Sequence, residues 1–297
     1  MKVVTLMSTM LAPKVAKELN VECITFGYEP FGDGEGKYIL HRNLKNEKIC
    51  YIQSFYPKQF ESVLRTRLAI DLLKQRGASY ITVIIPYLAF QRQDKPLVYE
   101  SRNAEVVLDI LGGSGVDDFG IEELLTVDPH SEIVLNKYPF FSGSLDPSDC
   151  MANYLRERGF DSPLIVAPDD NENAERKMVN IATALDSPCE GLHKHRDRKS
   201  GKLHFEKSSI NTHGVKMAVI VDDVIGSGDT LKGAAEILGR SGVDEIYAVV
   251  THALVSEKAE VKIKKSGIKE IISTDSIENK KFSRISLTPL IAKLFKN

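Results

Sequence analysis

Short runs of β-branched residues alternate with amphipathic helical patterns along most of this chain. Such alternation is typical of parallel sheets that carry helices on both faces. One helical pattern spans 62–75 and is closed by Gly77, and another spans 230–239. Strands are expected at 2–6, 48–52, 80–85, 124–127, 164–167, 216–221, 245–251 and 270–273.

A break in this pattern divides the chain into two α/β units of similar size. Pro139, Gly143 and Pro147 interrupt the periodicity between 138 and 148. With 297 residues the chain has the length of two ordinary domains, taking about 150 residues for each. We therefore expect an N-terminal domain at 1–143 and a C-terminal domain at 144–297, each with a mostly parallel sheet flanked by helices.

The charge of the chain is nearly balanced, with 39 basic and 41 acidic residues. This balance gives no general attraction to nucleic acid or to an anionic membrane, so any phosphate must be bound by local features. No signal peptide is visible, and no apolar run approaches the roughly 20 residues that a membrane span needs. The sequence predicts a cytoplasmic protein with no nucleic-acid or membrane partner.

The cysteines lie far apart and form no CxxC pair. This spacing matches neither a disulfide scaffold nor a zinc site. Four reduced thiols are therefore expected, at Cys23, Cys50, Cys150 and Cys189.

The sharpest functional motif follows the strand expected at 216–221. Two adjacent acids come first, and a Gly/Ser loop then leads into a helix. Neighbouring carboxylates can accept hydrogen bonds from the diol of a ribose and can help to hold Mg²⁺. Glycines allow a close backbone approach, and N–H groups at a helix N-terminus bind phosphate. An ordinary strand–helix turn with an aspartate cap shares some of these features, but the whole motif indicates a phosphorylated ribose. Its residues are Asp222, Asp223, Gly226, Ser227, Gly228, Asp229 and Thr230.

This segment resembles the phosphoribosyl-diphosphate loop shared by the phosphoribosyltransferases and the ribose-phosphate diphosphokinases. Asp229 stands where the diphosphokinases usually have glycine, whereas transferases of the xanthine–guanine type tolerate a similar Ser-Gly-Asp-Thr. An additional carboxylate near a phosphate weakens binding unless it points away. The loop alone does not distinguish the two reactions.

Two segments of the first half resemble the ATP-binding parts of the diphosphokinases. Residues 84–95 are similar to Pro-Tyr-x-x-Tyr-Ala-Arg-Gln-Asp, and this resemblance implies that Arg92 and Gln93 bind ATP. Residues 124–130 are similar to Thr-Val-Asp-Leu-His, whose histidine serves the Mg-ATP site, and this resemblance implies that role for His130.

A third segment implies a homo-oligomer. Residues 31–35 resemble Phe-x-Asp-Gly-Glu, which in this family reaches the adenine of an ATP bound mainly by a neighbouring subunit. The resemblance implies nucleotide contacts from Phe31, Asp33 and Glu35, and sites completed by a second copy of the chain. Taken without the resemblance, this segment is a Gly-rich turn between strands.

Residues 191–198 correspond to the family's catalytic Lys-x-Arg, which implies catalytic roles for Lys194 and Arg196. Phosphoryl and diphosphoryl transfer require cations aimed at charge that develops on phosphate oxygens. Two residues at alternate positions point the same way if the segment is extended. Without the resemblance this is an ordinary exposed run of charge.

One segment departs from the family pattern. Residues 166–176 align with Ser-Pro-Asp-x-Gly-Gly-x-x-Arg, so that Asp169 matches the metal-site aspartate and Arg176 the arginine. Asn171 and Glu172 replace the two glycines and would obstruct a close backbone approach to the ribose phosphate or metal. The departure leaves substrate affinity, metal geometry and activity open.

The resemblance covers nearly the whole chain and implies two phosphoribosyltransferase-like, Rossmann-like domains. It implies an enzyme that moves a diphosphate from Mg-ATP to ribose 5-phosphate, giving 5-phosphoribosyl 1-diphosphate and AMP. Two alternatives stay open: a phosphoribosyltransferase that consumes this product, and a non-catalytic relative that binds nucleotide or sugar phosphate and regulates a partner.

Overall fold

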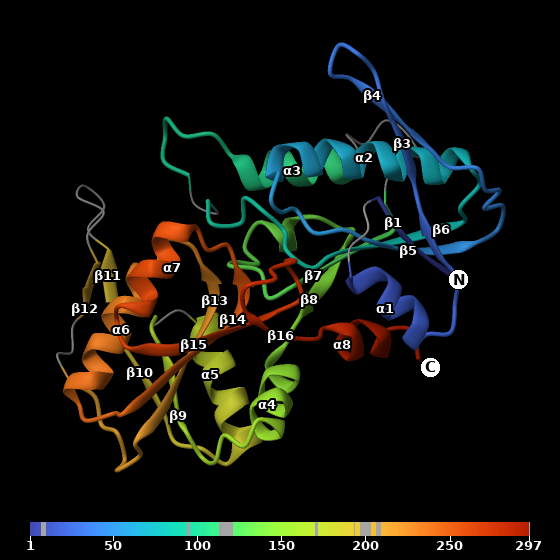
Figure 1. Cartoon of the computed structure of the whole chain (residues 1–297). Helices are drawn as coiled ribbons and strands as arrows, with labels where there is room; N and C mark the ends of the chain where they lie inside the picture. Colours follow the sequence, from blue (N-terminus) through green and yellow to red (C-terminus); the bar gives the residue numbers. More distant parts are fainter. Residues whose placement is uncertain are drawn as a thin grey trace. The chain divides into compact units, whose positions relative to one another are not determined.

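The computed structural model describes residues 1–6, 10–93, 96–112, 121–169, 172–192, 194–196, 203–205 and 209–296. The chain forms two compact units (Figure 1). Unit 1 comprises Met1–Leu145 and Thr288–Asn297, and unit 2 comprises Asp146–Leu287. The last residues of the chain, which the sequence analysis assigned to the C-terminal domain, therefore group with unit 1.

Unit 1 is built on a parallel sheet in the order β2-β1-β5-β6-β7-β8. Helix α8 packs beside α1, where Lys296 pairs with Glu18. The strands are β1 (Lys2–Thr5), β2 (Cys23–Thr25), β5 (Lys48–Ile52), β6 (Tyr80–Ile85), β7 (Glu123–Val127) and β8 (Phe141–Leu145). The helices are α1 (Leu11–Glu18), α2 (Gln59–Gln75), α3 (Asn103–Gly112), the short 3₁₀ turn η1 (Leu135–Lys137) and α8 (Thr288–Lys293).

Helix α2 shows how the sequence pattern becomes a packed face. Val63, Ile70 and Leu73 lie on its buried side, at the spacing of a 3.6-residue period. Leu64 and Leu68 of the same helix are apolar too, but their side chains are 60% and 46% exposed and lie on the outer side. Gly77 follows the helix with φ +93°, which confirms the glycine expected beyond its last turn.

Unit 2 carries a second parallel sheet, in the order β10-β9-β13-β14-β15-β16. The strands are β9 (Leu164–Ala167), β10 (Cys189–Gly191), β13 (Met217–Ile225), β14 (Glu245–Ala253), β15 (Ile268–Thr274) and β16 (Ser283–Ile285). The helices are α4 (Ser148–Glu157), α5 (Glu172–Leu185), α6 (Asp229–Arg240) and α7 (Glu257–Lys264).

Both faces of this second sheet are buried. On β13, Ala218 and Ile220 join a cluster with residues of α6, whereas Val219 and Val221 join a cluster with residues of α4 and α5. Alternation along one strand thus supplies an apolar core to each face. The predicted fold class, two α/β domains with mostly parallel sheets flanked by helices, is confirmed.

Two antiparallel ribbons lie outside the main sheets. One joins β3 (Gly27–Pro30) to β4 (Gly36–Ile39) and projects from unit 1 (Figure 1). The other joins β11 (Lys194–Arg196) to β12 (Leu203–Phe205) in unit 2. The first ribbon agrees with the Gly-rich turn between strands that the sequence indicates at 31–35, whereas the second ribbon was not predicted.

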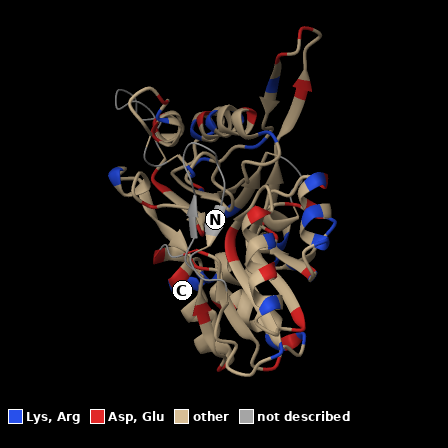
Figure 2. Ribbon diagram, turned by 90° about the vertical axis from the view of Figure 1, so that its left-hand side faces the viewer, with Lys and Arg blue, Asp and Glu red and all other residues tan. Residues whose placement is uncertain are grey.

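The surface carries both signs of charge, and the cysteines form no disulfide bonds. Figure 2 shows Lys and Arg interspersed with Asp and Glu on both units. The four cysteines are free thiols, and burial raises the pKa of Cys23, Cys50 and Cys189, which keeps them protonated at neutral pH. Over the described ranges, no helix is both long enough and apolar enough to cross a membrane.

Candidate functional site

The candidate ribose-phosphate residues gather at the carboxyl edge of the unit 2 sheet. Strands β9, β13, β14 and β15 are neighbours and run parallel, so the residues at their carboxyl ends share one edge. In open parallel sheets ligands bind at this edge. Asp169 follows β9 and is half-buried, and the acid pair lies in the last part of β13.

Both acids are oriented by the backbone. The strand was expected to end at Val221, but it continues to Ile225 because Val224 and Ile225 pair with β14. Asp222 is buried, and its Oδ1 accepts the N–H of Asp223 at 2.9 Å. Asp223 is partly exposed, and its Oδ1 accepts the N–H of Val224 at 2.7 Å. These bonds hold two carboxylates in place before any ligand arrives.

The loop after β13 needs a glycine at its last position. Gly228 has φ +77°, and a Cβ there would lie 2.7 Å from Cγ1 of Ile263 in α7. Only glycine accepts both this backbone conformation and this close approach. Helix α6 starts at the next residue, so the N–H groups of its first turn, which have no partner within the helix, lie beside Ser227 and Thr230. Such a helix start is suited to a phosphate group.

The unusual carboxylate of Asp229 is held by a cation. Its Oδ1 accepts a hydrogen bond from Nζ of Lys262 in α7 at 2.6 Å. The ion pair turns the carboxylate towards α7 and offsets its charge. This meets the condition under which the sequence analysis expected an acid to be tolerated in a phosphate loop.

Sequence reasoning assigned no role to a polar network beside the acids. Lys177 of α5 is only 3% exposed, and its Nζ donates to Oγ1 of Thr251 at 3.5 Å. Oγ of Ser276 donates to O of Thr251 at 2.8 Å and lies 2.8 Å from Nδ1 of His252. The network joins the carboxyl ends of β14 and β15. The sequence signal that could have identified this network is Lys177, which lies on the apolar side of its helical pattern, because buried lysines are rare.

The candidate ATP residues of unit 1 lie at the carboxyl ends of two neighbouring strands. Arg92 and Gln93 follow β6, and His130 follows β7. Arg92 is exposed, whereas Gln93 and His130 are half-buried. The segment after β6 is fixed to the end of β5, since the N–H of Phe55 donates to O of Tyr87 at 2.9 Å. The structure therefore brings these three residues to one edge of the sheet.

The residues at 31–35 form the tip of the β3–β4 ribbon rather than part of that edge (Figure 1). The N–H of Phe31 donates to O of Glu35 at 2.7 Å, and the N–H of Glu35 donates to Oδ1 of Asp33 at 3.0 Å. All three side chains are exposed. The ribbon thus presents an aromatic ring and two acids to the surroundings.

The structure gives only the backbone of the expected catalytic pair. Lys194 and Arg196 lie in β11, so the segment is extended as the sequence analysis required, but their side chains lie outside the described part. In the ribbon Lys194 stands opposite Phe205, whose ring contacts the position of Gly233 in α6. The ribbon is therefore anchored on the helix that follows the candidate phosphate loop.

The departing segment is described only in part. Asn171 lies outside the described residues, while Glu172 opens helix α5. Arg176 is exposed on the same helix.

The carboxylates of unit 2 suit a magnesium ion that arrives with a phosphorylated substrate. Among the described side chains, no three His, Cys, Asp or Glu residues are grouped to hold a metal. Mg²⁺ usually takes one or two protein carboxylates together with substrate phosphates, rather than a complete protein cage. Asp169, Asp222 and Asp223 offer the oxygen donors that this ion prefers.

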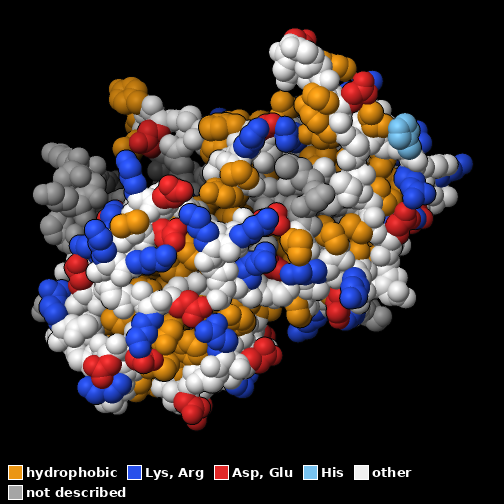
Figure 3. All heavy atoms as spheres, viewed as in Figure 1, with side chains coloured by type: hydrophobic (Ala, Val, Ile, Leu, Met, Phe, Trp, Pro, Cys, Tyr) orange, Lys and Arg blue, Asp and Glu red, His pale blue; other side chains and the backbone are white. Residues whose placement is uncertain are grey.

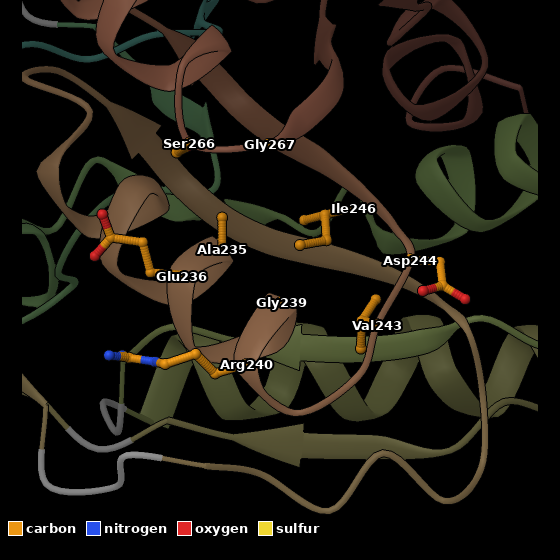
Figure 4. A pocket seen from close by; sticks show the side chains of 9 residues that line it. All are labelled: Ala235, Glu236, Gly239, Arg240, Val243, Asp244, Ile246, Ser266 and Gly267. Carbon is orange, nitrogen blue, oxygen red and sulfur yellow. The ribbon is translucent and has the colours of Figure 1, made fainter.

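An open pocket of about 390 Å³ lies at the other end of the unit 2 sheet (Figure 4). Ala235, Val243 and Ile246 line its centre, and the charged groups of Glu236 and Arg240 point away from it. It adjoins the amino ends of β14 and β15, and none of the candidate site residues lines it. This pocket is therefore not the site that the motifs predict.

Two family profiles match parts of this chain. Residues 1–115 match a family profile described as the N-terminal domain of ribose phosphate pyrophosphokinase. Residues 203–288 match one described as the phosphoribosyl synthetase-associated domain. The crystal structure of phosphoribosylpyrophosphate synthetase from Mycobacterium smegmatis has a TM-score of 0.81, covers 99% of this chain and 96% of that one, and is 22% identical. This structural similarity shows that the two chains share a fold.

Similarity to curated relatives extends through both units. The ribose-phosphate pyrophosphokinase of Methanobrevibacter smithii is 30% identical over 297 residues, which is 97% of each chain. That of Sulfurisphaera tokodaii is 27% identical over 284 residues, which is 94% of each chain. With this identity sustained over both units, the resemblance drawn from the motifs is confirmed, and the chain belongs to the ribose-phosphate pyrophosphokinase family of enzymes.

Proposed function

We propose that this chain transfers a diphosphate from Mg-ATP to the anomeric hydroxyl of ribose 5-phosphate, giving 5-phosphoribosyl 1-diphosphate and AMP. One observation carries the sugar-phosphate part of the proposal: two backbone-oriented carboxylates on β13 lead directly into a glycine loop and the start of α6. Membership of the ribose-phosphate pyrophosphokinase family supports the transfer of a diphosphate. Carboxylates that can accept hydrogen bonds from a diol, beside N–H groups that can bind a phosphate, offer the contacts that ribose 5-phosphate requires.

Each substrate has its own set of residues in this proposal. Asp222 and Asp223 accept hydrogen bonds from the ribose hydroxyls, and residues 226–230 bind the 5-phosphate. In unit 1, Arg92 and Gln93 hold ATP. His130 in unit 1 and Asp169 in unit 2 are the residues of each unit that would serve magnesium. The exposed tip at 31–35 completes the nucleotide site of a neighbouring copy.

The reaction forms one P–O bond, breaks another, and releases the proton of the attacking hydroxyl. The anomeric oxygen of the sugar bonds to the β-phosphorus of ATP, and the bond from that phosphorus to the oxygen shared with the α-phosphorus breaks. This oxygen leaves with AMP, and the hydroxyl proton passes to solvent. Lys194 and Arg196 neutralise the charge that grows on the phosphate oxygens. Cations aimed at developing charge act mainly on turnover.

The test of this proposal is the formation of AMP by the purified chain from ATP, Mg²⁺ and ribose 5-phosphate, with both products separated by anion-exchange chromatography. AMP and 5-phosphoribosyl 1-diphosphate in equal amounts, dependent on the sugar phosphate and stopped by EDTA, are expected. Release of diphosphate from 5-phosphoribosyl 1-diphosphate on addition of a nucleobase would instead identify a transferase. Folded protein that forms no AMP would favour the non-catalytic regulator.

The ion pair of Asp229 gives a testable consequence for substrate affinity. Lys262→Met leaves the carboxylate without its partner beside the bound phosphate, so the KM for ribose 5-phosphate is expected to rise by up to roughly fivefold, the equivalent of about 1 kcal/mol. Adding Asp229→Asn should restore the KM. The matched control is Lys264→Met, which removes an ion pair with Glu260 from the same helix. A raised KM that Asp229→Asn does not restore would contradict this role.

Self-association is part of the proposal and has a candidate surface. Leu64 and Leu68 on α2, with Val106 and Ile110 on the adjoining α3, are between 40% and 60% exposed. Hydrophobic side chains reach the surface of unit 1 over α2 in Figure 3. Exposed apolar groups clustered in this way are typical of protein interfaces.

Charged substitutions on this surface should dissociate the assembly. Leu64→Glu with Leu68→Glu is expected to lower the mass measured by sedimentation velocity, while circular dichroism stays native because both positions are exposed. Val179→Glu, at an exposed apolar position on α5, is the control. An unchanged mass would exclude α2 from the interface.

A further inference from the structure

Gln91 is a buried glutamine whose amide has no hydrogen-bond partner in the described structure. The residue is 2% exposed, and neither Nε2 nor Oε1 is bonded. Buried polar side chains are almost always paired, since an unpaired amide loses its bonds to water without replacement. The amide offers two N–H donors and a carbonyl acceptor. We therefore expect a group outside the chain to form hydrogen bonds with it.

The position of Gln91 indicates which partner. It directly precedes Arg92 and Gln93, the candidate ATP residues, at the carboxyl end of β6. The N–H of Gln93 donates to O of Phe90 at 3.3 Å and closes a tight turn around it. Phe90 adopts φ +71°, which is costly for an aromatic residue. The turn thus holds the amide in place at the cost of backbone strain.

The same turn also offers an aromatic surface. The rings of Phe90 and Phe60 are in contact, with centroids 4.7 Å apart. The ring of Phe60 is largely exposed, so one of its faces is accessible. Exposed aromatic rings are favourable stacking surfaces for a nucleobase. In the pattern that this segment resembles, alanine stands in place of Gln91, so the amide is a feature of this chain rather than of that pattern.

We propose that Gln91 reads the adenine of the donor nucleotide, with its carbonyl accepting from the exocyclic amino group and its N–H donating to a ring nitrogen. Glutamine makes this paired contact with adenine, whereas the corresponding edge of guanine presents two acceptors and favours arginine or lysine. Gln91 therefore selects ATP over GTP. This inference rests on the proposed ATP site and adds its base specificity.

The test compares the two nucleotides on Gln91→Met, which keeps the length of the side chain and removes the amide. With ribose 5-phosphate saturating, the KM for ATP is expected to rise roughly tenfold, as for one lost specific contact. The KM for GTP and that for ribose 5-phosphate stay unchanged, so the preference for ATP falls by the same factor. If this variant does not fold, Gln91→Ala, the residue of the resembling pattern, takes its place.

Gln53 supplies the matched control. It is also buried, at 5% exposure, but its Nε2 donates to O of Ser54 at 3.1 Å and its Oε1 accepts from Thr5. Gln53→Met should lower the melting temperature, whereas Gln91→Met should not, because it removes no bond within the described chain. A Gln91→Met protein that melts lower and loses both nucleotides equally would overturn the proposal, as would an unchanged preference for ATP.

A binding measurement separates this inference from the proposed function. Calorimetric titration with a non-hydrolysable ATP analogue and its guanine counterpart requires no turnover. If the unmodified chain binds neither analogue, the proposed ATP site itself is wrong. If the unmodified chain and Gln91→Met bind the adenine analogue equally well, the result supports the proposed nucleotide site and contradicts only the role of Gln91.

Discussion

Lys194→Ala is expected to lower kcat by roughly a hundred- to a thousandfold, the loss typical of removing one group that stabilises charge in a transition state. The lysine lies in β11, whose partner strand β12 is anchored on α6 through Phe205. A cation that acts on charge developing during transfer adds little to the binding of ground-state ATP. The KM for ATP should therefore change far less than kcat.

The control for this variant is Lys232→Ala. Lys232 is an exposed lysine on α6 whose Nζ lies 2.9 Å from Oε1 of Glu236, so its loss should leave kcat unaltered. Steady-state kinetics on both variants, with folding checked by circular dichroism, separates a catalytic role from a general effect of charge. A Lys194→Ala protein with undiminished kcat would remove this lysine from the mechanism.

Asp223→Ala is expected to lower kcat/KM for ribose 5-phosphate by roughly ten- to a hundredfold. A hydrogen bond to a charged group contributes about 1.5–3 kcal/mol, and about 1.4 kcal/mol corresponds to a factor of ten. The carboxylate is held by the N–H of Val224, so it loses little freedom when the ribose binds. The KM for ATP should stay unchanged, because the candidate ATP residues belong to unit 1.

Two comparisons sharpen this second experiment. Asp244→Ala removes an exposed acid beside the pocket at the opposite end of the same sheet and should have no effect. If Asp223 accepts from the 2-hydroxyl, 2-deoxyribose 5-phosphate should be a poor substrate for the unmodified chain and lose little more with Asp223→Ala. Fully additive losses would show that Asp223 and the 2-hydroxyl do not interact.

The main strands of the fold could be predicted because they are buried on both faces. Every strand expected from the sequence is present, and all are inner strands of the two sheets. The outer strands β2, β8, β10 and β16 were missed, since a short edge strand needs no continuous apolar run. The segment at 138–148, where the sequence pattern is interrupted, contains the edge strand β8 and the point at which the two units divide.

Candidate site residues could be recognised from the sequence where the chemistry lies in adjacent residues. The acid pair and the glycine loop are continuous in sequence, so their proximity needs no knowledge of the fold. The ion pair between Asp229 and Lys262 joins two helices, and the network around Thr251 joins two strands with α5. Such contacts depend on tertiary packing, which no local pattern encodes. The roles of Lys194 and Arg196 came from resemblance alone, because an isolated pair of basic residues is chemically unremarkable on a protein surface.

Tracing the β-phosphorus of ATP tests the central claim most directly. The purified chain is incubated with ribose 5-phosphate, Mg²⁺ and ATP labelled at the β-phosphorus, and the products are separated by chromatography. The proposed transfer of an intact diphosphate predicts that the label appears in 5-phosphoribosyl 1-diphosphate while unlabelled AMP forms in equal amount. Label recovered in ADP, or retained in ATP by well-folded protein, would contradict the account.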